Sequence, residues 1–106
     1  MTREKEREIR RIYIERVLKL TLKPKKGFES IQYAIQRKTD AEYIRIKDKR
    51  GTSMTLDITG ESLEDIMHSV FKIIIIGEMG KHERLTAPAN IVTDRDELLK
   101  IAPLFE

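Results

Sequence analysis

Residues 41–71 read AEYIRIKDKRGTSMTLDITGESLEDIMHSVF, and they hold the clearest structural signals of the chain. Apolar and polar side chains alternate on both sides of segment 49–52, which has the composition of a turn. The apolar members of the alternation are Ile44, Ile46, Met54, Leu56 and Ile58. Such alternation is typical of strands that bury one face, so we expect an antiparallel β-hairpin.

A long amphipathic helix is expected directly after the hairpin. Thr59, Gly60 and Ser62 are candidate N-cap residues. Glu64 and Asp65 fall in the first turn, where the helix dipole favours carboxylates. The apolar residues that follow at helical spacing are Leu63, Ile66, Met67, Val70, Phe71 and Ile74. Gly77 or Gly80 is expected to end the helix.

The segment Ile73–Ile76 of this helix is apolar all round. Four successive isoleucines leave no polar side over a full turn, so this turn has to be covered on every side. We expect either the C-terminal tail or a second subunit to cover it, and the second alternative makes the protein a homodimer.

A first helix is expected from Thr2 to about Arg16. The apolar residues fall at helical spacing and form one stripe: Ile9, Ile12, Tyr13 and Val17, with Leu20 continuing it. The stripe predicts a helix with one apolar side and a strongly charged remainder.

The period of the pattern changes where this helix is expected to end. Leu18, Leu20 and Leu22 alternate with polar residues as in a half-buried strand, and Pro24 ends regular pairing. Segment 30–38 fits both helical and strand spacing, and a strand is the favoured interpretation. The number of strands is therefore three or four.

A short helix is expected near the C-terminus. Thr93 and Asp96 resemble a capping box, and Pro103 is expected to stop the helix. Residues 1–106 are thus expected to form a single α+β domain: an N-terminal helix, an antiparallel meander of three to four strands, a long amphipathic helix and a short C-terminal helix. With four strands, this element order resembles that of small dimeric single-strand-binding proteins of the Whirly kind, a likeness that carries no site residues.

The composition limits the kinds of protein that the chain can be. It has 106 residues, of which 40% are hydrophobic and 37% charged, enough apolar material for one core. No cysteine is present, which excludes disulfides and cysteine-ligated metals. The first residues are charged rather than apolar, so we expect a cytoplasmic protein. The apolar run Ile73–Ile76 is far shorter than a membrane-spanning helix, so no membrane partner is expected.

Positive charge is concentrated at the N-terminus. The formal net charge is +3, but residues 1–26 hold ten Lys or Arg against four Glu, a net charge of +6. The other 80 residues hold 11 Lys or Arg against 14 Asp or Glu, a net charge of −3. Such an asymmetry suits a polyanionic partner, and it also serves solubility.

Catalytic residue patterns are not evident in the sequence. The two histidines, His68 and His82, have no recognisable triad partner, although Glu64 lies four residues before His68. The acidic residues near the C-terminus lack the glycine and the distal glutamate of a calcium loop. We therefore expect a protein that is not an enzyme and that uses no metal or cofactor.

The candidate binding surface is the sheet face opposite the core. Strand alternation would place four cationic side chains and one aromatic ring there, and single-stranded nucleic acid is bound by such sets because cations follow phosphates while rings stack on bases. The set consists of Lys19, Lys23, Tyr43, Arg45 and Lys47, joined from the first helix by Arg10 and Arg11. The first hypothesis is therefore a small basic protein that binds single-stranded DNA or RNA. Lysine-rich sheet faces also occur for solubility alone, and that interpretation stays open.

The alternative hypothesis is a protein-interaction effector. Compact proteins of phages and other mobile elements block or redirect host machinery by steric occlusion, and this chain has two apolar segments that suit such contacts. They comprise Ile9, Ile12 and Tyr13 of the first helix and Ile73, Ile75 and Ile76 of the long helix. Binding that survives moderate salt would distinguish this hypothesis from nucleic-acid binding.

Overall fold

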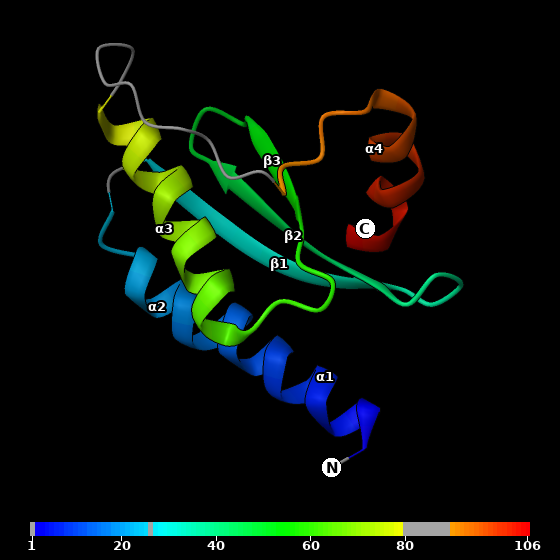
Figure 1. Ribbon diagram of the computed structural model, residues 1–106. Coiled ribbons are helices and arrows are strands. Elements are labelled where there is room, and N and C mark those ends of the chain that lie inside the picture. The colour runs from blue at the N-terminus through cyan, green and yellow to red at the C-terminus, as the bar shows by residue number, and fades with distance from the viewer. Residues whose placement is uncertain (1, 26, 80–89) are drawn as a thin grey trace.

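The computed structural model describes residues 2–25, 27–79 and 90–106, without the side chains of residues 75–79. A three-stranded antiparallel sheet lies between two groups of helices (Figure 1). The N-terminal helical run and helix α3 (Leu63–Met79) pack on one face, and the C-terminal helices pack on the other. The expected α+β class and the expected order of helix, meander, long helix and short helix are confirmed.

The sheet contains strands β1 (Phe28–Gln36), β2 (Ala41–Asp48) and β3 (Ser53–Asp57), in the order β1-β2-β3. The predicted hairpin is β2–β3, and the ambiguous segment 30–38 forms most of β1. The β2–β3 turn is closed by one carboxylate oxygen, because Asp48 Oδ1 accepts hydrogen bonds of 2.9 Å from the backbone N–H groups of Arg50 and Thr52. Gly51 supplies the left-handed backbone conformation of this turn, with φ of +90°.

A β-bulge near the start of β1 keeps Phe28 in the core. Phe28 pairs with Asp48 and Ser30 pairs with Lys47, so Glu29 is an extra residue. Without it, strand alternation would turn Phe28 to the face opposite Ile31. With the bulge, both side chains are buried in the same cluster.

The N-terminal residues form one helical run rather than a helix and a strand. It consists of α1 (Arg3–Ile12), the π-helical segment η1 (Tyr13–Leu18) and α2 (Lys19–Leu22). The predicted strand at Leu18, Leu20 and Leu22 is therefore wrong, and the described residues contain three strands rather than four. The side chains of Leu18 and Leu22 are 2% and 0% exposed, whereas Leu20 is 69% exposed. The four-residue spacing of the two buried leucines is the spacing of a helix. The hydrophobic period changes at the π-helical segment.

The main core lies between this helical run, α3 and the sheet. Its fully buried large side chains come from all three, and each contributes about 1.5–3 kcal/mol of hydrophobic stabilisation. They are Ile14, Leu18, Leu22, Ile44, Leu56, Ile58, Ile66 and Val70. This core fixes the helical run against the sheet and leaves its other side to solvent.

Helix α3 begins after Ser62, one of the expected N-cap residues. Ser62 Oγ accepts a hydrogen bond of 3.1 Å from the N–H of Asp65, and the helix runs to Met79. It continues past Gly77, so this glycine does not end it, and Gly80 lies outside the described residues.

Ile73 and Ile74 are half-buried against the main core. Of the described C-terminal residues, Ile91 packs against the same core, while the C-terminal helices pack on the opposite face of the sheet. Residues 80–89 and the side chains of Ile75 and Ile76 lie outside the described residues, so the expected cover of this turn stays a prediction.

Residues 90–106 form the second layer of helices. Asn90 and Val92 extend the sheet beyond β3: Asp57 N–H donates to Asn90 O, and Val92 N–H donates to Thr55 O, each at 2.9 Å. Helix α4 (Arg95–Ile101) and the 3-10 helix η3 (Ala102–Phe105) follow.

The cap of α4 is Asp94, one residue after the expected Thr93. Its Oδ1 accepts from the N–H groups of Asp96 at 2.8 Å and Glu97 at 3.1 Å. Asp94 thus takes up the first orphan N–H groups of the helix, which explains this acidic segment without a metal. In the part of the chain that the structure describes, no helix is long and apolar enough to cross a membrane.

Candidate nucleic-acid interface

The sheet face proposed as an open binding surface is covered by the C-terminal helices. Tyr43 is 6% exposed and packs in a second apolar cluster. The other buried members of the cluster are Ala34, Val92, Ile101 and Phe105. Tyr43 therefore lies under α4 and η3, and the expected exposure of its ring is wrong. Burial, together with nearby acidic groups, raises the pKa of its phenol.

Arg45 lies on the same covered face. Its guanidinium group is 4.8 Å from the centre of the Phe105 ring and donates to Gln32 Oε1 at 3.2 Å. The Arg45 side chain is half-buried, and its cation interacts with groups of the protein itself. The local alternation correctly placed Tyr43 and Arg45 on one face, but it could not show that a distant segment covers that face.

Arg10 and Arg11, expected to contact phosphates, are engaged in the fold instead. Arg10 Nε lies 2.5 Å from Glu42 Oε2, and its two terminal nitrogens donate to the carbonyl oxygens of Glu61 at 2.6 Å and Ile58 at 3.0 Å. Arg11 lies 5.1 Å from the centre of the Tyr33 ring and 3.2 Å from Glu15 Oε1.

Tyr33 and Glu42 complete this polar contact under the N-terminal helix. The Tyr33 hydroxyl donates to Glu42 Oε2 at 2.7 Å. Burial of the phenol, and then its hydrogen bond to the carboxylate, raise the pKa of Tyr33 far above its ordinary value. The hydroxyl is therefore a hydrogen-bond donor at neutral pH.

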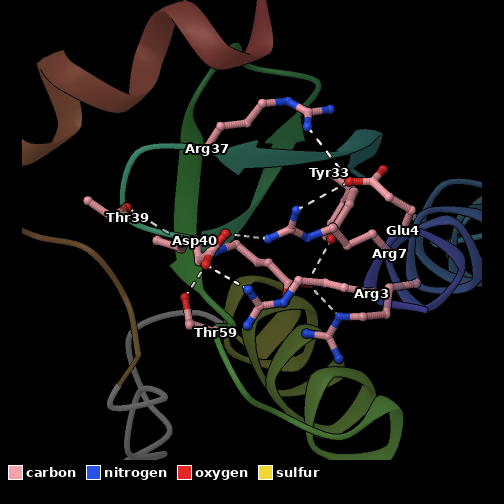
Figure 2. A network of polar contacts seen from close by, with 11 residues as sticks. Arg3, Glu4, Arg7, Tyr33, Arg37, Thr39, Asp40 and Thr59 are labelled. Atoms are coloured by element: carbon pink, nitrogen blue, oxygen red, sulfur yellow. Dashed lines mark hydrogen bonds and ion pairs between the residues drawn. The ribbon is translucent and has the colours of Figure 1, made fainter. Parts of the chain in front are cut away.

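A second group of arginines surrounds the β1–β2 turn. Figure 2 shows Arg3 and Arg7 reaching toward Asp40, with N–O distances of 2.7 Å to its two carboxylate oxygens. The hydrogen bond from Arg7, and then the charge of Arg3, lower the pKa of Asp40. Arg37 also points into this network, toward Glu4 at 3.8 Å. These contacts attach α1 to the sheet, and neutralise much of the positive charge of the N-terminal helix.

Five further basic residues gather at the opposite end of the sheet. The connection from α2 to β1 and the β2–β3 turn lie side by side there, because Lys49 N–H donates to Gly27 O at 2.8 Å. Gly27 has φ of +94°, so the connection turns in a left-handed conformation at this contact. We call the exposed cationic side chains of this end the basic pole. It consists of Lys23, Lys25, Lys47, Lys49 and Arg50.

The acidic residues near the basic pole offset little of its charge. Glu29 lies 4.0 Å from Lys47 and is half-exposed. The Asp48 carboxylate is taken up by backbone N–H groups of the turn. Lys19 extends the pole along the helix, one turn before Lys23 and on the same side. Of the predicted nucleic-acid residues, Lys19, Lys23 and Lys47 thus lie at this end of the protein, with Lys47 on the sheet face opposite the helical run.

A second surface lies on the outer side of the N-terminal helical run. Exposed fractions are 44% for Ile9, 40% for Ile12, 48% for Val17 and 69% for Leu20, and we call these four residues the apolar row. Ile9 and Ile12 belong to the predicted protein-interaction set. Val17 and Leu20 continue the predicted helical stripe, but they were not in the predicted interaction set, because the strand interpretation assigned Leu20 to the core.

The other members of the predicted protein-interaction set are less exposed or fall outside the description. Tyr13 is half-buried beside the main core, as is Ile73 of α3. Ile75 and Ile76 lie outside the residues whose side chains the structure describes. The apolar row therefore replaces the predicted set as the candidate contact surface.

The described residues offer little for catalysis. His68 and Glu64 are exposed and 4.0 Å apart on the outer side of α3. Within residues 2–25, 27–79 and 90–106, no group of three His, Asp or Glu side chains is placed to hold a metal ion. The basic pole and the apolar row are the two features that remain for a functional interpretation.

Comparison with known proteins finds no matching family model, no matching curated protein and no matching solved structure.

Proposed function

We propose that this chain is a non-enzymatic binding protein that holds the phosphate backbone of a nucleic acid with its basic pole. The observation that carries the proposal is the contact between Lys49 and Gly27, which joins two lysine-bearing loops into one surface. Lysine and arginine side chains on adjacent loops attract phosphates and release counterions when they bind. Lys23 and Lys25 bring part of the positive charge of the N-terminal quarter to this surface.

The geometry favours recognition of phosphates rather than of bases. Tyr43, the candidate stacking residue, is buried, and the described residues of the two loops carry no exposed aromatic ring. Contacts to the backbone fix a protein on nucleic acid without reading its sequence. We therefore expect binding of little sequence preference and steep salt dependence. If all five cations of the pole contact phosphates of a duplex, affinity falls roughly 500-fold between about 50 and 200 mM salt.

Fluorescence anisotropy of labelled single-stranded and duplex oligonucleotides at these two salt concentrations tests the proposal. We expect Lys49→Glu combined with Arg50→Glu to weaken binding at least tenfold. The matched control is Arg37→Glu combined with Lys38→Glu, the same charge change in the turn at the opposite end of the sheet. Its effect should stay below about threefold, because distant surface charges are largely screened. Equal losses in the two variants, or no binding at the lower salt, would contradict the proposal.

The second candidate function is a protein-interaction effector of the phage or mobile-element type. The exposed apolar row favours it, since contiguous apolar surface on a small protein marks contact sites. A partner bound there should stay bound at 200 mM salt and should be lost on Val17→Glu. The charge reversals at the basic pole should leave such a complex intact.

A further inference from the structure

Four exposed side chains concentrate on one side of the N-terminal helical run. The described residues include six large apolar side chains that are exposed, and the apolar row accounts for four of them. The other two, Met54 and Leu99, lie on separate elements. Isolated exposed apolar residues are normal on protein surfaces, whereas a row along one helix suits a helix-on-helix contact.

The π-helical segment explains why the row is continuous. The residues of the apolar row are spaced by three, five and three positions: Ile9, Ile12, Val17 and Leu20. In a regular α-helix, a step of five residues turns about 140° beyond one full turn and would break the row. Segment η1 covers this step, and residues five apart stack on successive turns of a π-helix. Val17 thus follows Ile12 on the outer side of the run.

The spacing of the row is the same in both chain directions. Reversal about the midpoint between Ile14 and Glu15 exchanges Ile9 with Leu20 and Ile12 with Val17. A two-fold symmetric dimer requires such a self-complementary surface, in which residue i meets residue j and j meets i. We propose that the apolar row is the interface of a homodimer in which two N-terminal helical runs pair antiparallel.

In this arrangement Ile9 faces the partner's Leu20, and Ile12 faces the partner's Val17. The same symmetry places Arg16 opposite the partner's Tyr13, a cation beside an aromatic ring. Lys5 faces the partner's Pro24. A parallel pairing would instead set Arg16 against the partner's Arg16 and Lys5 against the partner's Lys5. Like charges that face one another are unfavourable, so the charge pattern selects the antiparallel arrangement.

The length of the helical run sets the size of this contact. A contact between two helical runs of about 30 Å lies at the small end of specific interfaces. We therefore expect a dimer that dissociates in the micromolar range.

Sedimentation velocity over about 1 to 500 µM of the full chain tests the dimer. We expect a concentration-dependent shift from the 12.4 kDa monomer to twice that mass. Val17→Glu should raise the dissociation constant at least tenfold, while Leu99→Glu, at an even more exposed apolar position on α4, should leave it within about twofold. Circular dichroism should show that both variants are folded. A monomer at every concentration, a dimer insensitive to Val17→Glu, or a monomer that binds vesicles through this helix would overturn the proposal.

Disulfide cross-linking tests the antiparallel pairing separately, because the chain has no cysteine of its own. An equimolar mixture of Ile12→Cys and Val17→Cys chains is oxidised and analysed by mass. Antiparallel helices bring position 12 level with the partner's position 17, whereas 12 to 12 and 17 to 17 are offset by about 7.5 Å along the axis. We expect the mixed cross-link to dominate. A predominance of 12 to 12 and 17 to 17 products would show a parallel pair and overturn the arrangement.

Discussion

Arg10 joins three separate parts of the chain through one guanidinium group. Its acceptors are the carboxylate of Glu42 on β2 and the carbonyl oxygens of Ile58 and Glu61 before α3. A planar fork of five N–H donors suits three acceptors at different angles, and a lysine ammonium on its flexible stem does not reproduce this geometry. The side chains of Arg10 and Glu42 are both mostly buried, so water replaces these contacts poorly when they are lost.

Replacement of Arg10 should therefore destabilise the protein. We expect Arg10→Ala to lower the free energy of unfolding by about 3 kcal/mol, because it leaves a mostly buried carboxylate unpaired. Arg10→Lys should lie between this variant and the unmodified protein. Arg16→Ala, which removes an exposed arginine from the same helical run, should change stability by no more than about 0.5 kcal/mol. Urea unfolding measures all three, and equal losses for Arg10→Ala and Arg16→Ala would refute the role of the network.

Tyr33 gives the protein a defined alkaline response. Its phenol has a raised pKa in the folded state because of burial and its hydrogen bond to Glu42, whereas the unfolded chain ionises near pH 10. The contribution of Tyr33 to the free energy of unfolding is therefore fully present below pH 10 and declines above it, because the unfolded state releases this proton more readily than the folded state. We expect Tyr33→Phe to show a smaller loss of unfolding free energy between about pH 9 and pH 11 than the unmodified protein. An unchanged pH dependence in this variant would count against the assignment.

The N-terminal helical run shows how a helix can be mistaken for a strand where three leucines alternate with polar residues. Leu18 and Leu22 are spaced as neighbours on a helix, and Leu20 lies between them on the opposite side. Both interpretations place Leu18 in the core, but only the strand also places Leu20 there. The two leucines therefore distinguish the interpretations directly.

Leu18→Ala should lower the free energy of unfolding by about 3 kcal/mol, because it leaves a cavity among fully buried neighbours. Leu20→Ala in dilute protein should change it by no more than about 0.5 kcal/mol, because this side chain is mostly exposed. Thermal or urea unfolding provides the comparison. Similar losses for the two variants would support a strand in this segment.

Local sequence patterns predicted the elements that carry their own turn or cap residues. The β2–β3 hairpin and α3 each combine regular spacing with their own turn or cap residues, such as Asp48 and Ser62. The site was harder, because alternation tells which residues share a face but not what lies against it. Tyr43 and Arg45 are covered by residues about 60 positions later in the chain, a contact that no local pattern encodes. The basic pole likewise depends on two loops that meet only in the folded protein.

The molecule as a whole is a sheet covered on both sides by helices (Figure 1). The basic pole and the apolar row lie on different parts of it. On one side the cover consists of the C-terminal helices α4 and η3. Phe105 is the central contact of this layer, because it packs with Tyr43 in the second cluster and lies against the Arg45 guanidinium.

Phe105→Ala should open this cover. We expect a loss of about 3 kcal/mol in unfolding free energy and a larger fraction of tyrosine fluorescence accessible to acrylamide, because Tyr43 becomes exposed. Leu99→Ala is the control, since this side chain belongs to the same layer and is 68% exposed. If quenching and stability were alike in the two variants, the C-terminal helices would not be the cover described above.

The acceptors of Arg10 also bear on the order in which the chain acquires its structure during synthesis. They follow Arg10 by 32, 48 and 51 residues, so at about 5–20 residues per second a ribosome releases the last of them roughly 3–10 s after Arg10. An isolated helix of the length of α1 is marginal in water during that interval. The contacts of Arg10 are therefore complete only seconds after α1 itself has been synthesised.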